Sequence, residues 1–483
     1  MPKSELENLH AEFARLRAVR QAGRVCAVEA GYLRVTGLCA ATRIGDRLRV
    51  MRRSGAWLDG EVLQLRANDL MMLPDASTQG VALGDPVLLQ DPADIAPTDA
   101  WLGRVIDPYG NPLDGRQLLR GTQSRPVLAG PPPPAQRRGF GARLETGLTA
   151  FNTILPLVRG QRLGLFAGSG VGKSSLLAKL ARQVQADVVV VALIGERGRE
   201  LREFVDTVLG ADGMARTVVV AATSDRSALV RRRCAWTAMS VAEHFRDQGL
   251  HVLLLADSVT RFAEAHREVA VAGGEAAALR GFPASTAHTI MSLCERAGPG
   301  AGDSGDITAV FTVLVAGSDM DEPVADILRG VLDGHVVMDR RIAERGRYPA
   351  IDFLRSVSRS LPSAATETEC AQLSEVRRLL AVYEQSEVMI RAGLYVDGSD
   401  PLLDRAISIW SELDAFLAEE ERIDIANSFA RLGLLLRRAR PVLPRTGQLS
   451  PMIQRESNAT PETQMSVASV AARRTIPQGR SGN

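Results

Sequence analysis

The sequence predicts an α/β protein whose core is a mostly parallel sheet, with a small β-barrel before it and a helical domain after it. Three observations predict this fold class. Between about residues 145 and 355, short apolar runs alternate with loops and helical patterns. Short β-like segments separated by Gly and Asp turns precede that region, and sequence with helical periodicity follows it.

Length and charge limit the classes of protein to consider. With 483 residues the chain is too long for one simple core, so we expect two to four domains. The net charge of +2 gives no global attraction to nucleic acid or anionic lipid. No apolar run reaches the ~18 residues that span a bilayer, and the first residues contain no apolar signal core. We expect a cytoplasmic protein, with peripheral membrane association left open. Five scattered cysteines without metal-ligand spacing fit a reducing compartment: Cys26, Cys39, Cys234, Cys294 and Cys370.

The first segment has apolar residues at helical spacing, namely Leu6, Leu9, Phe13 and Leu16. This pattern fits an amphipathic helix that binds a partner, and it fits equally well a helix packed on its own domain. From Gly23 to about Leu89, short β-like runs predict the barrel. The turn-rich and proline-rich residues 91–140 are interpreted as a linker into the next domain.

Five nearly continuous apolar runs predict strands buried on both faces of a parallel sheet: "RLGLF", "DVVVVALI", "TVVVAAT", "HVLLLAD" and "ITAVFTVLV". Residues 363–440 are helical in pattern, and the polar tail beyond them is expected to be disordered. The predicted boundaries are a partner-binding helix at 1–22, a barrel at 23–95, a phosphate-binding α/β domain at 96–362, a helical domain at 363–440 and a tail at 441–483.

The segment "AGSGVGKS" has the pattern of a phosphate-binding loop, with a predicted strand before it and a helix after it. Glycines let successive backbone N–H groups point inward, and the helix N-terminus faces the same point. Lys173 is expected to reach the β- and γ-phosphates, and Ser174 to place its hydroxyl on Mg²⁺. The expected nucleotide-binding residues are Ala167, Gly168, Ser169, Gly170, Val171, Gly172, Lys173, Ser174 and Ser175.

Two carboxylates follow other apolar runs. Asp257 should emerge at the carboxyl end of its strand, where it could hold the Mg²⁺ shell rather than only cap a helix. Glu196, in "ALIGERGRE", could polarise the attacking water or form a surface ion pair with a neighbouring arginine. From spacing alone, these two readings of Glu196 are evenly balanced.

From about Gly103 to Arg359, the sequence resembles the rotary hexameric ATPases with a RecA-like core, and more narrowly the ATPases of flagellar and type III protein export. The resemblance is carried by "RGQRLGLFAGSGVGKSSLL" at 159–177, "GERGREL" at 195–201, "FRDQGLHVLLLADSVTRFAEAHREVA" at 245–270, "GSDMDEPVADILRGVLDGHVVMDRRIAERGRYPAID" at 317–352 and "SVSR" at 356–359. These blocks are long and occur in the family's order. The resemblance extends more weakly into the barrel and the helical domain.

This resemblance implies roles for individual residues. Glu196 matches the water-activating glutamate, and Arg197 and Asp257 match residues near the γ-phosphate and the metal. Arg261 matches an arginine that contacts the γ-phosphate, and Tyr348 matches the aromatic residue that packs on adenine. The last match is Arg359, which corresponds to an arginine finger supplied to a neighbouring subunit's ATP.

The resemblance also implies partners. They are other copies of the chain in a homohexamer, a regulatory stator-like protein at the N-terminal helix, a central stalk protein, an export gate and chaperone–cargo complexes at the inner membrane. In the segment "GGEAAALRGF", Ala276 and Ala277 stand where the family usually has prolines, so the rigidity of this loop is open.

The predicted function is Mg-ATP hydrolysis that drives flagellar protein export. Alternatives within the enzyme class are an injectisome export ATPase and the catalytic subunit of a rotary ATP synthase. A weakly hydrolysing ring component is the alternative outside it, and the carboxylate at Glu196 argues against that. An RNA helicase is disfavoured because residues 1–95 show no excess of positive charge and only three aromatic side chains, those of Phe13, Tyr32 and Trp57.

Overall fold

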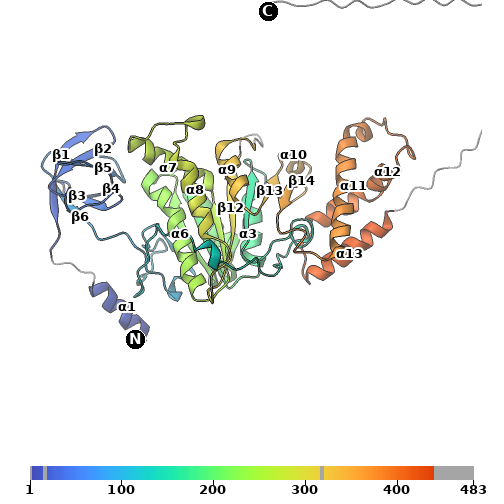
Figure 1. Ribbon diagram of the computed structural model, residues 1–483, viewed down its shortest axis with the longest axis horizontal. Coiled ribbons are helices and arrows are strands. Elements are labelled where there is room, and N and C mark those ends of the chain that lie inside the picture. The colour runs from blue at the N-terminus through green and yellow to red at the C-terminus, as the bar shows by residue number, and fades with distance from the viewer. Residues whose placement is uncertain (1–2, 15–18, 316–319, 440–483) are drawn as a thin grey trace, which may run out of the picture. The chain divides into compact units, whose positions relative to one another are not determined.

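Six antiparallel strands of the computed structural model close into a barrel, in the order β1-β2-β5-β4-β3-β6 (Figure 1). Their side chains alternate between buried and partly exposed positions, as in β2 and β4, because one face of each strand fills the barrel. Leu33, Val35, Leu48 and Val50 are fully buried there. The strands are β1 (Ala22–Glu29), β2 (Tyr32–Thr36), β3 (Arg47–Met51), β4 (Trp57–Leu65), β5 (Leu70–Pro74) and β6 (Pro86–Leu89).

The structure describes residues 3–14, 19–315 and 320–439. The predicted tail at 441–483 lies outside these residues. Helix α1 spans Lys3–Ala14, and Phe13 is 66% exposed on it. Leu16 and the side chain of Leu6 are outside the described part of the chain.

The central sheet has eight strands in the order β14-β13-β8-β12-β11-β9-β10-β7. All neighbouring strands are parallel except β13 and β14, which pair antiparallel at one edge. The five apolar runs identified in the sequence form β8 to β12, which confirms the predicted fold class. The strands are β7 (Arg104–Ile106), β8 (Arg162–Ala167), β9 (Val188–Glu196), β10 (Thr217–Thr223), β11 (Val252–Asp257), β12 (Ile307–Leu314), β13 (Gly334–Met338) and β14 (Ile351–Ser358).

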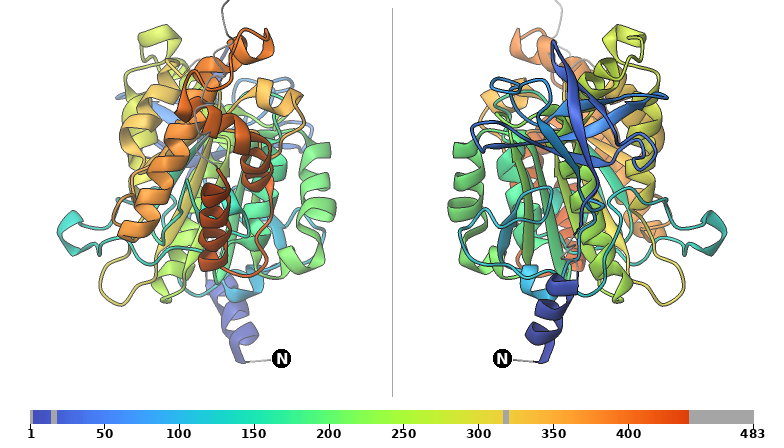
Figure 2. Two further views of the ribbon diagram at one scale, coloured as in Figure 1. Left: turned by 90° about the vertical axis from the view of Figure 1, so that its right-hand side faces the viewer. Right: turned by 90° about the vertical axis from the view of Figure 1, so that its left-hand side faces the viewer.

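Helices cover both faces of this sheet (Figure 2). On β9, Val189, Val191 and Leu193 pack in a core with α3 and the C-terminal helices, whereas the alternate residues Val190 and Ile194 pack in a second core with α6, α7 and α8. Both faces are therefore apolar, as a buried parallel strand requires. The helices of this region are α2 (Thr149–Asn152), α3 (Lys173–Gln183), α4 (Gly198–Glu203), the π-turn η3 (Phe204–Leu209), α5 (Gly210–Ala215), α6 (Ala228–Asp247), α7 (Val259–Ala272), α8 (Ser285–Arg296), α9 (Pro323–Val331) and α10 (Arg340–Glu344), with 3₁₀ turns η1 (Asp99–Trp101), η2 (Pro134–Gln136) and η4 (Leu279–Gly281).

The interpretation of residues 91–140 as a linker is wrong in part, because β7 lies within them and forms the edge of the sheet beside β10. Trp101 is also buried, with 1% of its surface exposed. The Arg104 guanidinium binds both carboxylate oxygens of Asp114, at 2.6 and 2.9 Å, which fixes the turn after this short strand. Three residues that begin with arginine are too short a run to identify a strand from periodicity.

Three helices follow the sheet: α11 (Glu367–Arg391), α12 (Pro401–Ala418) and α13 (Ile425–Arg438). Thr366 and Glu369 form a capping box at the start of α11, and this box satisfies free backbone N–H groups. Lys179 on α3 forms an ion pair with Glu420 at 2.7 Å, which links the helix after the phosphate loop to the turn after α12. No helix in the described part of the chain is both long enough and apolar enough to cross a membrane.

Candidate functional site

The phosphate loop joins the carboxyl end of β8 to the amino end of α3. β8 ends at Ala167 and α3 begins at Lys173. Gly170 and Gly172 have φ angles of 79° and 87°, a left-handed backbone conformation that residues with a Cβ rarely adopt. A Cβ on Gly172 would lie 3.1 Å from Cδ1 of Tyr348, so the tyrosine ring rests directly against the loop. The backbone of this loop therefore has the curled shape that the motif predicts.

Lys173 points to the carboxyl end of β11, where its Nζ forms an ion pair with Oδ1 of Asp257. Asp257 is the last residue of that strand and is only 5% exposed. Thr312, on the neighbouring strand β12, donates a hydrogen bond of 2.7 Å to the same oxygen. Thr312 was not singled out in the sequence, although a hydroxyl inside an apolar run is a signal that could have identified it.

Glu196 ends β9, which lies beside β11 in the sheet. Its carboxyl group is half-buried, and burial together with the negative charge of Asp257 raises its pKa to about 7, although Lys173 opposes this shift. The Glu196 carboxyl also hydrogen-bonds to that of Glu200, which lies one helical turn later. The pKa of Glu200 is lowered, first by this hydrogen bond and also by Arg197. Glu200 is a second neighbour that the sequence reasoning missed.

Two predicted arginines lie at this end of the sheet. Arg261, in the first turn of α7, packs its stem against Gly195: a Cβ placed on that glycine would be 3.4 Å from the arginine Cβ. Its guanidinium donates a hydrogen bond of 3.0 Å to Glu264. Arg197 is exposed and binds Glu200 at 3.2 Å. The structure therefore brings the phosphate loop, Asp257, Glu196 and Arg261 together.

Arg359 lies at the other end of the sheet. Its backbone N–H binds the carbonyl of Asp333, and the Asp333 N–H binds the carbonyl of Arg162, the first residue of β8. The phosphate loop begins at the last residue of β8, about 16 Å further along the strand at 3.3 Å per residue. The exposed Arg359 side chain donates to the carbonyl of Arg329 at 3.1 Å. Within one chain, Arg359 is not part of the group around the loop.

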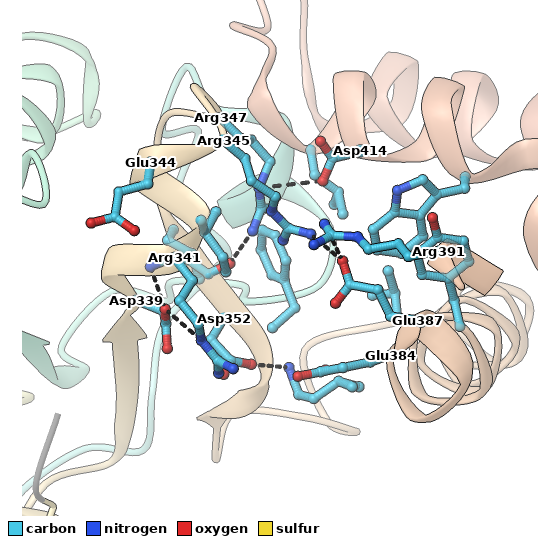
Figure 3. Close-up of a pocket in the computed structure, with 18 of the residues that line it drawn as sticks. Asp339, Arg341, Glu344, Arg345, Arg347, Asp352, Glu384, Glu387, Arg391 and Asp414 are labelled. Carbon is cyan, nitrogen blue, oxygen red and sulfur yellow. Dashed lines mark hydrogen bonds and ion pairs between the residues drawn. The ribbon is translucent and has the colours of Figure 1, made fainter. Parts of the chain in front are cut away.

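A hollow of about 620 Å³ lies between residues 339–354 and the helices α11 and α12, next to the segment that carries Tyr348 (Figure 3). Arg347 reaches Asp414 on α12 at 3.4 Å, and Arg345 reaches Glu387 on α11 at 3.0 Å. Both arginines lie within the three residues before Tyr348, so the segment against the phosphate loop is also tied to the C-terminal helices. No sequence pattern predicts this hollow, because its walls come from distant segments.

The loop with two alanines at 276–277 is closed at its base by a carboxylate. Glu275 accepts hydrogen bonds from the backbone N–H and the hydroxyl of Ser285, at 2.9 and 2.6 Å. Ala277 and Pro283 also pair across the loop in a short antiparallel bridge. Side-chain and backbone contacts therefore hold this loop without the two prolines.

Comparison with known proteins places this site in a family. Residues 147–358 match the ATP synthase alpha/beta family, nucleotide-binding domain, and residues 365–433 match the T3SS EscN ATPase C-terminal domain. The flagellum-specific ATP synthase of Caulobacter vibrioides is 43% identical over 440 residues, which cover 89% of this chain and 99% of that protein. The type 3 secretion system ATPase of Pseudomonas syringae pv. tomato is 42% identical over 419 residues, which cover 85% of this chain and 92% of that protein.

A solved structure of the assembled ATPase EscN in complex with its central stalk EscO, from enteropathogenic E. coli, superposes with a TM-score of 0.78. It is 36% identical in sequence, and the match covers 86% of this chain and 100% of that chain. The fold, the nucleotide-binding domain and the enzyme class predicted from the sequence are confirmed by these matches. The chain is an ATPase that belongs to the family of flagellar and type III export ATPases, within the ATP synthase alpha/beta superfamily.

Proposed function

We propose that this ATPase hydrolyses Mg-ATP in a homohexameric ring and drives the export of flagellar proteins. The observation that carries the proposal is the gathering of the phosphate loop, Asp257, Glu196 and Arg261 at the carboxyl end of one parallel sheet. Ligands of such sheets bind at this end, where the loops of adjacent strands converge.

The residues around the loop fit a triphosphate and a magnesium ion. Curled backbone N–H groups and the amino end of α3 suit phosphate oxygens, and Lys173 supplies a cation. The Ser174 hydroxyl and the Asp257 carboxylate are hard oxygen donors, and Mg²⁺ is commonly held by one or two such groups together with substrate phosphates. When bound, Mg²⁺ would neutralise charge on the β- and γ-phosphate oxygens. ATP binding then requires Lys173 to exchange part of its ion pair with Asp257 for phosphate.

Glu196 is proposed to orient the attacking water. A carboxylate whose pKa lies near 7 can accept a proton from water at Oε as the phosphoryl group is transferred. In-line attack on the γ-phosphorus breaks its bond to the β–γ bridging oxygen, and the products are ADP and inorganic phosphate. Lys173 and Arg261 stabilise the negative charge that spreads over the transferred oxygens, with Arg197 nearby.

Arg359 is proposed to act on the ATP of a neighbouring subunit. It lies too far from its own phosphate loop to contact the same nucleotide, so a second copy must supply this cation. An arginine of this kind contributes roughly 10³–10⁵ in rate, so activity should depend on assembly. Tyr348, half-exposed against Gly172, is proposed to pack on the adenine ring.

Flagellar export is proposed over injectisome export because the flagellum-specific relative from Caulobacter is 43% identical to this chain. The type 3 secretion relative from Pseudomonas is nearly as similar, at 42% identity. We infer a cytoplasmic protein that associates with the inner-membrane export gate and receives chaperone–cargo complexes. A central stalk protein is a proposed partner because the related EscN binds one. The exposed Phe13 face of α1 is the proposed contact for a stator-like regulator. The domain boundaries at 22, 95, 362 and 440 stay a prediction.

The central test is Glu196→Gln, with nucleotide binding measured alongside turnover. We expect Mg-ATP to bind as in the wild type while hydrolysis falls at least about a hundredfold, because the amide cannot accept the proton. Full turnover would remove Glu196 from the mechanism. Loss of binding would instead indicate that Glu196 maintains the shape of the site.

Mixing two inactive variants tests the neighbour's role. Lys173→Ala keeps Arg359 but cannot bind phosphate, and Arg359→Ala keeps the phosphate loop but lacks the finger. In a randomly mixed ring, about a quarter of the interfaces combine an intact loop with an intact finger. Activity should therefore reappear on mixing, and its complete absence would contradict completion of the site between subunits.

Deletion of the gene for this chain distinguishes a role in flagellar export from a role in an injectisome. We expect loss of motility and of filament-protein secretion, with effector secretion unchanged. The opposite pattern would assign the chain to an injectisome and leave the ATPase mechanism intact.

A further inference from the structure

We propose that Glu264 is a positioning residue that holds the Arg261 guanidinium in place for the γ-phosphate. The inference rests on the proposed role of Arg261 in hydrolysis. It adds a residue that no motif in the sequence identified, and it concerns the preparation of the site rather than the contact with substrate.

Arg261 is fixed at its backbone and along its stem. Its N–H donates to the Ser258 hydroxyl, the N-cap of α7, at 3.3 Å, and Ser258 directly follows Asp257. Cβ and Cγ of Arg261 lie 3.4 and 3.5 Å from the position of a Cβ on Gly195, which directly precedes Glu196. Arg261 is therefore held against the chain neighbours of both Asp257 and Glu196.

Among the residues that the structure describes, one side chain orients the end of Arg261. The Arg261 Nη1 donates to Oε2 of Glu264 at 3.0 Å, one turn later on α7. The Nε of Arg261 is buried and has no hydrogen-bond partner among the described residues. This N–H is therefore not engaged by the described part of the protein and remains for a ligand oxygen. Two parallel N–H donors on one edge match the geometry of phosphate oxygens.

The ion pair itself is partly exposed, with 44% of the Arg261 side chain and 29% of the Glu264 side chain accessible, so it adds little to stability. Its effect is on freedom of motion. An unrestrained arginine samples many rotamers, and a donor that is already oriented needs no reorganisation when charge develops on the phosphoryl group. Glu264 thus acts on the rate through Arg261.

A second arginine in the same place shows the contrast. Arg231 also flanks Gly195, with its Cδ 3.5 Å from the Cβ position. Both oxygens of Glu268 bind it, at 3.0 and 2.9 Å, and its Nε donates to a backbone carbonyl at 3.1 Å. The protein holds that guanidinium at both Nη2 and Nε, whereas the described residues leave the Nε of Arg261 without a partner. The arrangement around Arg261 is therefore suited to a ligand and that around Arg231 to structure.

The experiment compares full-length Glu264→Ala, Glu264→Gln, Arg261→Ala and the Glu264→Ala/Arg261→Ala double variant. Asp206→Ala is the matched control, because Asp206 pairs with Arg202 on a helical surface at 3.2 Å and both side chains are well exposed. The measurements are kcat, KM, ADP affinity, affinity for ADP with aluminium fluoride, and the melting temperature. ADP lacks the γ-phosphate, whereas ADP with aluminium fluoride imitates the transferred group.

For Glu264→Ala we expect kcat to fall about three- to tenfold, because the guanidinium becomes mobile, while ADP affinity and the melting temperature stay unchanged. Affinity for ADP with aluminium fluoride should fall by the same factor. Glu264→Gln, which keeps an oxygen acceptor, should retain most of the activity. In the Arg261→Ala background, removal of Glu264 should have no further effect.

Unchanged or increased turnover in Glu264→Ala would overturn the inference, and an increase would mean that Glu264 competes with phosphate for Arg261. Equal losses with and without Arg261 would also overturn it, because Glu264 would then act independently. Full activity in Arg261→Ala would instead refute the proposed role of Arg261 itself. The two failures are therefore distinguishable.

Discussion

Replacing Gly172 by alanine tests the phosphate loop and the adenine contact in one experiment. Gly172 has a φ of 87°, and an L-residue in that conformation costs about 1–2 kcal/mol. If binding requires the curled loop, this strain should weaken phosphate binding by a factor of about 5–30. The new Cβ would also lie 3.1 and 3.2 Å from two carbons of the Tyr348 ring, which is tight enough to displace the ring.

Gly170 provides the matched control. Its φ of 79° gives the same backbone strain, but a Cβ there would meet nothing within 4 Å. Gly170→Ala should therefore show the backbone effect alone. The additional effect in Gly172→Ala should come from displacement of Tyr348, and it should disappear when Tyr348 is also replaced by alanine.

The assay is equilibrium binding of ATP and of inorganic tripolyphosphate, which has no base. Both variants should lose similar affinity for tripolyphosphate, whereas Gly172→Ala should lose more affinity for ATP. If Gly172→Ala lost the same affinity for ATP as for tripolyphosphate, the contact between Tyr348 and adenine would be refuted. Binding of tripolyphosphate by Gly170→Ala as tight as that of the wild type would refute the argument from backbone strain.

Three further predictions concern charge. Burial lowers the pKa of His251 from 6.5 to about 4, so the neutral form is favoured in the folded state. The contribution of His251 to the free energy of unfolding is then complete above pH 6.5 and is lost as the pH falls toward 4, by up to about 3 kcal/mol. In His251→Gln, the free energy of unfolding, followed by circular dichroism, should therefore fall less steeply between pH 6.5 and 4. An unchanged pH dependence would contradict this. Asp257→Asn removes a negative charge that raises the pKa of Glu196, so that pKa should fall below 7 in a carboxyl-detected NMR titration, whereas a rise would reverse the assigned sign. Arg296 is 2% exposed and binds both oxygens of the buried Glu243. Arg296→Ala should therefore lower the free energy of unfolding, measured with urea, by about 3–5 kcal/mol, because it leaves a buried charge without its partner. A decrease below about 1 kcal/mol would indicate that Glu243 becomes neutral in the variant.

The sequence predicted the parts of the fold that depend on local patterns. Apolar runs identified five of the inner strands, β8 to β12, and one of them placed Asp257 correctly at a strand end. The edge strands β7 and β14, and β13 beside β14, were missed because they are short or contain polar residues, such as Arg104 and His335. An edge strand is buried less uniformly than a central one, so its periodicity is weaker.

The site was predictable where a motif dictates geometry. Lys173 and the phosphate loop follow from spacing, and Glu196 gained its assignment only from the family resemblance. Contacts between distant segments, such as Tyr348 against Gly172, could not be derived from the sequence because they depend on how the strands are ordered. Glu264 has no signal at all, since an acid three residues after an arginine is common on any helix surface.

The antiparallel pairing of β13 with β14 has a consequence for control in the cell. By reversing direction at the edge of the sheet, the chain leaves Arg359 at the end remote from its own phosphate loop. With Arg359 in its proposed role on a neighbour's ATP, a newly made single subunit would hydrolyse little ATP, and no dedicated inhibitor would be needed to prevent futile hydrolysis. A high local concentration of subunits at the export site would drive ring assembly and thereby turn on ATP hydrolysis. Every subunit interface would have the same direction around the ring.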